Sequence, residues 1–169
     1  QRMILHNLEF EAFMAYPKRQ EINFDTLNNA GVFLLNGPTG AGKSTLLDAL
    51  CLALFGAVPR LNNTGRDAKV PDADGEIATG DPRTLLRRGT GEGYAEVDFV
   101  GIDGRRYRAR WEANRAREKA NGKLQASRQS LRDLDSDQLL ASQKSDYKVQ
   151  LESRLGLNFE QFTRAVMLA

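Results

Sequence analysis

The chain has little of the chemistry on which several protein classes depend. Its 169 residues include one cysteine, Cys51, and one histidine, His6. A single cysteine excludes an internal disulfide and a cysteine-based zinc cluster, and a single histidine leaves few options for histidine-based catalysis or metal binding. Cys51 lies in the apolar stretch 50–55, so we interpret it as a small core residue of a protein in a reducing compartment. We interpret His6, within an expected strand, as structural.

Long hydrophobic runs are also absent, and so is a large net charge. No apolar run approaches the roughly 20 residues that span a bilayer, and no signal-peptide pattern opens the chain, so we expect no membrane partner. The net charge is +2, but residues 83–132 hold 13 Lys and Arg against 6 Asp and Glu. Such a basic segment suits contact with a polyanion. The 41% hydrophobic content suits one domain with a core.

What the sequence does contain is the phosphate-binding pattern G-x-x-x-x-G-K-S at residues 37–44. It follows the apolar run 32–35 and precedes the largely apolar stretch 46–55, which predicts a strand, a loop and a helix in the order that this pattern requires. The glycines permit a backbone whose N–H groups converge on phosphates. Lys43 supplies a mobile charge for the β- and γ-phosphates, and Ser44 a hydroxyl for Mg²⁺.

We therefore predict a nucleotide site in which Lys43 is the catalytic residue and Ser44 the metal ligand. Its members form one continuous segment: Asn36, Gly37, Pro38, Thr39, Gly40, Ala41, Gly42, Lys43, Ser44 and Thr45. The alternative is a glycine-rich turn between a buried strand and a buried helix. Phe13 and Tyr16 fall in an early turn, where they either pack in the core or lie against a base.

The remaining elements are predicted from periodicity and turn residues. We expect strands at 3–10, 22–24 and 31–35, a helix over 43–55 buried beneath a sheet and ended by Gly56, and a long mobile loop over 57–81. Residues 89–93 are interpreted as a flexible segment without a ligand that leads into a strand. A strand over 124–134 and a turn at 135–137 precede an amphipathic helix ended by Gly156. A last helix follows, capped by Asn158 and Gln161, stapled by Leu157 and facing inward through Phe159, Phe162 and Val166.

Residues 94–112 predict a hairpin. A two-residue turn at Asp103-Gly104 would mix apolar and charged faces, whereas a three-residue loop 102–104 pairs Phe99 with Tyr107 and leaves Gly104 left-handed. The second register sets Asp98 against Arg108 and Glu96 against Arg110, which makes them a paired, solvated face. The less compensated cations are the candidate DNA-backbone contacts: Arg87, Arg88, Arg115, Arg117, Lys119 and Lys123.

Three functional hypotheses fit these features. The first is a nucleotide-binding lobe of an ATPase. A self-sufficient P-loop hydrolase needs a second apolar strand ending in Asp, and we find none, so this chain is expected to bind nucleotide better than it hydrolyses it. The alternatives are a complete small P-loop kinase or GTPase, which needs a guanine-reading or lid motif that we also do not find, and a DNA-binding module with an incidental P-loop.

The order of the parts resembles the N-terminal segment of the SbcC family of SMC-like ABC-type ATPases, bacterial relatives of the double-strand-break repair ATPases. The matching stretches run nearly end to end, at residues 12–16, 22–24, 37–56, 59–60, 104–107, 156–157 and 162–168. The loop alone is generic, whereas the closing stretch from Phe162 to Leu168 is more specific. Related repair ATPases often carry Arg at the position of Met14, so this sequence departs from their pattern there.

The resemblance implies an α/β fold: the N-terminal lobe of an ABC-type P-loop ATPase head with a mixed or antiparallel β-subdomain. Within 1–169 we expect strands, P-loop and helix at 1–56, a mobile loop at 57–93, a β-region at 94–134 and two helices at 142–169. The cofactors implied are ATP and Mg²⁺. A Q-loop, a coiled coil and a C-terminal lobe with signature and Walker B motifs are expected elsewhere in a longer protein, so this segment alone is expected to be inactive.

The resemblance also implies partners and location. Family members work as the ATPase subunit of an exonuclease complex with an SbcD-type nuclease, on DNA ends and hairpins. ATP closes a dimer of heads and its hydrolysis reopens the dimer. A cytoplasmic, nucleoid-associated protein is expected.

Overall fold

The computed structural model describes residues 3–11, 18–23, 40–59, 69–72, 75–78, 81, 83, 92–119 and 121–167. The side chains of 20–23, 40–46, 69–72, 75–78 and 166–167 are not part of that description. Several predictions fall outside the described residues: Phe13, Met14 and Tyr16, the strand 31–35, the loop residues Asn36–Thr39, and Arg87 and Arg88.

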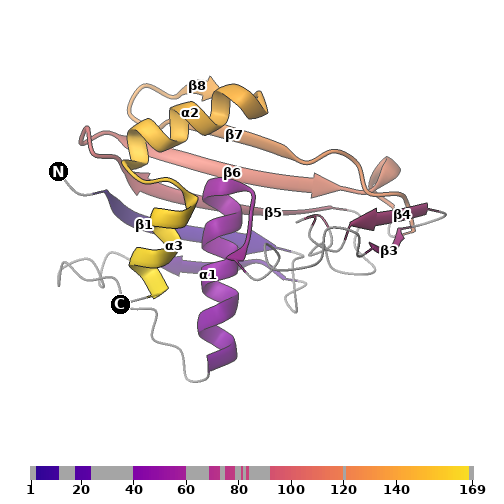
Figure 1. Ribbon diagram of the computed structural model, residues 1–169. Coiled ribbons are helices and arrows are strands. Elements are labelled where there is room, and N and C mark those ends of the chain that lie inside the picture. The colour runs from indigo at the N-terminus through magenta and orange to yellow at the C-terminus, as the bar shows by residue number, and fades with distance from the viewer. Residues whose placement is uncertain are drawn as a thin grey trace.

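A six-stranded antiparallel sheet forms the body of the molecule, with strand order β2-β1-β5-β6-β7-β8. A separate hairpin pairs β3 with β4. Figure 1 shows α1 standing across the strands with α3 beside it, and α2 along β7 and β8. The element bounds are β1 (Ile4–Glu11), β2 (Gln20–Asn23), α1 (Gly40–Phe55), β3 (Lys69–Asp72), β4 (Gly75–Ala78), β5 (Glu92–Val100), β6 (Arg106–Asn114), the short 3₁₀ turn η4 (Ala116–Glu118), β7 (Arg128–Asp133), β8 (Gln138–Ala141), α2 (Lys144–Leu155) and α3 (Phe159–Met167).

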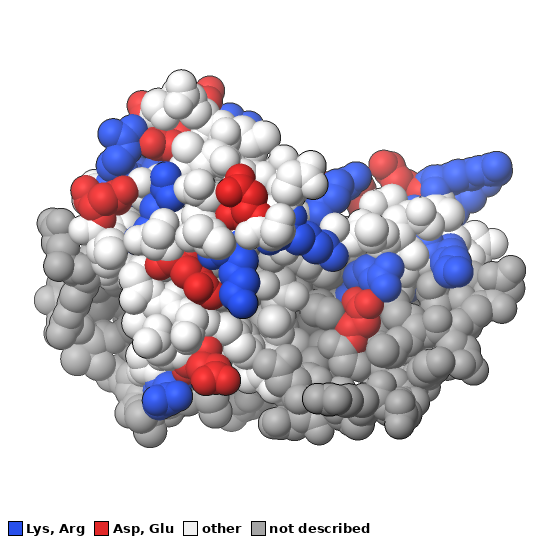
Figure 2. All heavy atoms as spheres, turned by 45° about the horizontal axis from the view of Figure 1, so that its top comes forward, with Lys and Arg blue, Asp and Glu red and all other residues white. Residues whose placement is uncertain are grey.

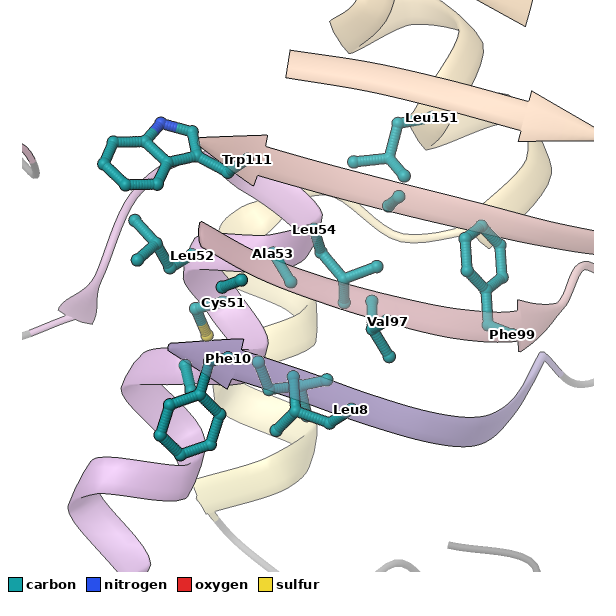
Figure 3. Packing of buried hydrophobic residues seen from close by; sticks show 14 of the residues in the cluster. Leu8, Phe10, Cys51, Leu52, Ala53, Leu54, Val97, Phe99, Trp111 and Leu151 are labelled. Atoms are coloured by element: carbon teal, nitrogen blue, oxygen red, sulfur yellow. The ribbon is translucent and has the colours of Figure 1, made fainter. Parts of the chain in front are cut away.

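The two faces of the sheet differ because side chains alternate along each strand. One apolar row crosses five strands through Leu8, Val97, Ala109, Leu131 and Ala141, which pair in register and are all buried. The helices cover this face, and Figure 3 shows the side chains of α1 interleaved with those of β1, β5 and β6. Most charged residues of the same strands therefore lie on the opposite face, whereas Asp133, which pairs with the buried Tyr107 and is 6% exposed, shares the face of Leu131.

The predicted hairpin register is confirmed. Phe99 pairs with Tyr107, and the rings lie 5.6 Å apart between centroids. The Gly101 N–H donates to the Arg105 carbonyl at 2.9 Å, which leaves three loop residues, and Gly104 has φ +80°. Only glycine adopts this left-handed conformation without a steric cost, so the loop length and the residue at its end specify each other.

The helix α1 is buried beneath the sheet, as predicted, but it begins at Gly40, three residues before the expected start. Residues 49–54 are fully buried, including Cys51, whose pKa burial raises far above its ordinary value. The prediction of a core cysteine is therefore confirmed. His6 lies in β1, as expected of a strand residue.

The loop predicted over 57–81 is wrong in part, because 69–72 and 75–78 pair as β3 and β4. Pro71 made β3 difficult to predict from the sequence, because proline donates no ladder hydrogen bond and is tolerated only in edge strands such as these. Glu92 and Gly93, expected in a flexible segment, belong to β5. The strand expected over 124–134 is shorter, and the short strand β8 after the 135–137 turn was not predicted.

The C-terminal helices follow their predicted boundaries. Tyr147, Leu151 and Leu155 are the buried face of α2, and Gly156 ends it in the left-handed conformation at φ +79°. The predicted reciprocal cap of α3 is confirmed, since the Asn158 N–H donates to Gln161 Oε1 at 2.9 Å and the Gln161 N–H to Asn158 Oδ1 at 2.8 Å.

Inward-facing residues of the last helix agree with the prediction where side chains are described. Phe162 is fully buried, and Phe159 and Leu157 pack against the core. The Val166 side chain lies outside the described part. None of the helices in the described ranges is both long enough and apolar enough to span a membrane.

Candidate functional site

The described part of the predicted nucleotide loop is the start of α1. Residues 40–45 have helical backbone there, so Gly40 to Thr45 form the first turns. Early turns of a helix leave N–H groups without an intrahelical acceptor, and they lie at the positive end of the helix dipole. Backbone donors of this kind, followed by Lys43 and Ser44, are chemically suited to a phosphate chain with Mg²⁺.

The rest of α1 holds that start in place. Residues 49–54 are 0% exposed, so the helix cannot shift without uncovering the core. At its other end, the Gly56 N–H donates to the Leu52 carbonyl at 2.9 Å, and the buried Tyr147 hydroxyl donates to the Leu54 carbonyl. The packing of the helix therefore fixes the position of the residues at its N-terminus.

Sequence reasoning missed one charged side chain in this helix. Asp48 is 4% exposed and follows Ser44 by one turn. Besides burial, its charge contributes to the raised pKa of Cys51. The sequence does contain a signal for Asp48: it is an acid inside an otherwise apolar helix, and a buried carboxylate is costly without compensation. Within the described ranges, no three His, Cys, Asp or Glu side chains are grouped so as to hold a metal ion.

The outer face of the sheet carries the predicted pairs of opposite charge. Arg108 binds Asp98 in two-point fashion, with Nε–Oδ1 at 2.7 Å and Nη2–Oδ2 at 2.9 Å. Arg110 donates from Nη1 to Glu96 at 2.9 Å and from Nε to Glu112 at 3.1 Å. Four further arginines have carboxylate partners within 3.4 Å: Arg105, Arg106, Arg128 and Arg132.

These contacts shift the pKa values of the face. The hydrogen bond from Arg108 to Asp98 raises the pKa of its guanidinium, against the opposing effect of burial. Burial, reinforced by the hydrogen bond that Tyr94 donates to Glu9, raises the pKa of the Tyr94 hydroxyl. The Arg110 guanidinium also lies 4.1 Å from the centre of the Tyr94 ring. The prediction of a paired, solvated face is confirmed.

The turn between β6 and β7 carries cations of another kind. The Ala116 N–H donates to the Lys123 carbonyl at 2.7 Å, and Arg115 bridges to Leu124 as an isolated β-pair. Residues 115–124, which we call the basic turn, thus form a closed protrusion. Arg117 has φ +56°, which turns the chain sharply at its tip.

The cations of the basic turn differ in their pairing. Arg117, Lys119 and Lys123 are exposed and form no ion pair with any residue in the described ranges. Arg115 is half-buried and donates to the Gly122 carbonyl at 3.4 Å, so it is partly engaged. In Figure 2, Lys and Arg gather on the protruding end of the molecule, whereas basic and acidic side chains alternate over the helices. Within the described ranges, the structure thus separates these three cations from the arginines that carboxylates bind.

Comparison with known proteins identifies relatives of this chain. The family model described as an AAA domain matches residues 7–169. The SbcC component of the nuclease SbcCD from Pseudomonas aeruginosa is 63% identical over 153 residues, which cover 89% of this chain and 13% of that protein. The protein of the same name from Rhodobacter capsulatus is 48% identical and covers 94% of this chain and 13% of its own length. The resemblance predicted from the sequence is confirmed.

A solved structure supports the predicted fold class. The recombination mediator protein RecF of the RecFOR pathway, in a structure with ATP, aligns with a TM-score of 0.50 at 19% identity. The alignment covers 83% of this chain and 28% of that one. This likeness concerns the fold alone, and it agrees with an α/β P-loop ATPase lobe that carries an antiparallel sheet. The chain spans about an eighth of the length of the curated relatives described above.

Proposed function

Because this chain belongs to the AAA domain family, we propose that it is the ATP-binding lobe of an SbcC-like ATPase. The observation that carries the proposal is the position of Gly40 to Ser44, the described end of the motif G-x-x-x-x-G-K-S, at the start of α1, a helix whose later turns are fully buried. A phosphate-binding loop needs such a fixed helix, since its backbone donors must keep their direction when the anion arrives.

Each residue of the loop has a proposed role that follows from its chemistry. Residues 36–42, except Pro38, which has no N–H, and Thr45 provide backbone donors to the phosphate chain, and Lys43 places an ammonium beside its outer phosphates. Ser44 offers its hydroxyl to Mg²⁺. ATP bound there supplies a triphosphate whose terminal group can be cleaved by hydrolysis. We propose that the cleavage step needs Q-loop, signature and Walker B residues from a more distant segment.

We further propose that the longer protein acts on DNA ends and hairpins with an SbcD-type nuclease, through an ATP-dependent dimer of heads. The names of the relatives support the nuclease partner, because both proteins are named as components of the nuclease SbcCD. DNA contacts are assigned to the unpaired cations of the basic turn, together with Arg87, Arg88 and the partly engaged Arg115. Phosphate contacts of this kind position DNA without reading its sequence.

Calorimetry with ATP and Mg²⁺ tests the nucleotide site. The unmodified chain should bind in a one-to-one ratio, and Lys43→Ala should abolish binding because the ammonium contact is lost. Lys123→Ala is the matched control: it removes the same charge far along the chain and should leave the ATP affinity unchanged. Intact binding by the Lys43→Ala chain would remove the proposal.

A further inference from the structure

A pocket of about 290 Å³ opens on the helix side of the sheet, at the C-terminal end of α1. Its walls are Phe55 of α1, the buried Tyr147 and Leu151 of α2, and Phe159 of α3. Phe55 and Phe159 meet edge to face at 5.5 Å between ring centroids and are only half-buried. Most other aromatic residues of the described core are fully buried, so these two rings leave apolar surface at the pocket wall.

Two cations lie on one side of the pocket mouth. Lys144 and Lys148 are one turn apart on α2, both exposed, and neither forms an ion pair in the described part of the chain. Lys144 contributes to the lowered pKa of Asp81, but that carboxylate is already bound by Arg83 at 2.7 Å. Glu152, one turn after Lys148 on α2, is the acid among the lining residues.

The start of α2 adds little to this positive potential. The residue before it, Gln143, makes no side-chain hydrogen bond to the helix, but Asp146 in the first turn is an acid that offsets the positive end of the helix dipole. The two lysines alone therefore make one side of the mouth suited to carboxylates.

Gln129 of β7 adds a neutral polar group to the pocket. It stands opposite Trp111 in the β6–β7 register, which directs it to the helix side of the sheet. Its side-chain amide lies so close to Gly56 that a Cβ added to this glycine would come within 2.4 Å of the Gln129 Nε2 atom. No described residue forms a hydrogen bond with this amide. It thus offers one donor and one acceptor, the pair that a peptide backbone requires.

We propose that this pocket binds a short acidic segment of a protein partner, which inserts one large apolar side chain between the two phenylalanines and places carboxylates beside the two lysines. The pocket volume lies at the lower limit for small-molecule pockets, about 300 Å³, and also has room for one or two side chains. The charges select an acidic segment, and Gln129 is placed to hold its backbone. Phe55 lies about 18 Å along α1 from Lys43, at 1.5 Å per residue, so the segment and a nucleotide can bind together.

Selection from a phage-displayed library of random peptides on the full chain tests the proposal. The selected peptides should share a large apolar residue next to Asp or Glu. In fluorescence anisotropy, Lys144→Glu with Lys148→Glu should weaken their binding about tenfold or more, since attractive charges at the mouth become repulsive. Both positions are exposed, so the fold should survive, and circular dichroism checks this. Arg164→Glu is the matched control: it reverses an exposed charge on α3 outside the pocket and should not change the affinity.

Several results would overturn the proposal. One is a selection that enriches no apolar-acidic pattern, and another is equal peptide affinity in the lysine and Arg164 variants. Displacement of the peptide by duplex DNA would assign the two lysines to nucleic acid instead. A chain dimer that dissociates only in the double lysine variant would make a second copy the occupant.

Discussion

The unpaired cations of the basic turn lead to a quantitative prediction about DNA. Arg117→Gln, Lys119→Gln and Lys123→Gln together should weaken binding to duplex DNA and flatten its dependence on salt. Each cation that neutralises one phosphate contributes about 0.9 to the slope of log affinity against log salt concentration, so three contribute about 2.7. When the salt concentration rises from about 50 to about 200 mM, these three contacts alone account for a loss of about 40-fold in DNA affinity. Fluorescence anisotropy over a salt series measures both slopes.

The paired arginines provide the control for this experiment. Arg106→Gln with Asp135→Asn, and Arg132→Gln with Asp137→Asn, remove two cations together with the acids they bind. Because these charges already neutralise each other, the control should leave the slope within experimental error of the original. A control that flattens the slope as much as the triple variant would refute the distinction between paired and available cations. An unchanged slope in the triple variant would refute DNA contact by the basic turn.

Further predictions concern stability, measured as the free energy of unfolding in urea. Asn158→Ala should cost about 1 kcal/mol, because it removes the side-chain half of the α3 cap; a loss near zero would show that the cap contributes nothing. Gly104→Ala should cost about 1–2 kcal/mol, since φ +80° forces a Cβ into a disfavoured conformation. Burial opposes ionisation of Asp133, but the Arg105 hydrogen bond and two backbone N–H groups hold its pKa below the ordinary value. Its contribution is therefore complete above about pH 4 and is lost as the pH falls through the lowered pKa. Asp133→Asn should reduce the stability lost on acidification, and an unchanged pH profile would contradict this assignment.

Local signals in the sequence predicted much of the fold. The register of β5 and β6 followed from alternation and the loop length, because a shift by one residue would place Phe99 opposite Arg108. Gly156 and the pair Asn158 and Gln161 marked helix ends, since these residue types satisfy the backbone groups that helix ends expose. The loop motif and the family resemblance needed no coordinates at all.

Weak local signals account for the missed elements. The hairpin of β3 and β4 contains Pro71 and few apolar residues, and β8 is four residues long. Such strands form because a partner strand supplies their hydrogen bonds, and that partner is not visible in the local pattern. The start of α1 at Gly40 was missed for a related reason, since glycines have low helix propensity and tertiary context overrides it.

The sequence by itself determined the phosphate-loop chemistry, the family and the alternation that divides the sheet into an apolar and a charged face. Only the tertiary structure decided which cations are available, because Arg106 and Lys119 look alike until Asp135 is found bound to one of them. It also decided that two phenylalanines, two lysines and one glutamine meet in a pocket. Pairing and proximity depend on residues distant in the chain, and the folded arrangement alone brings those residues together.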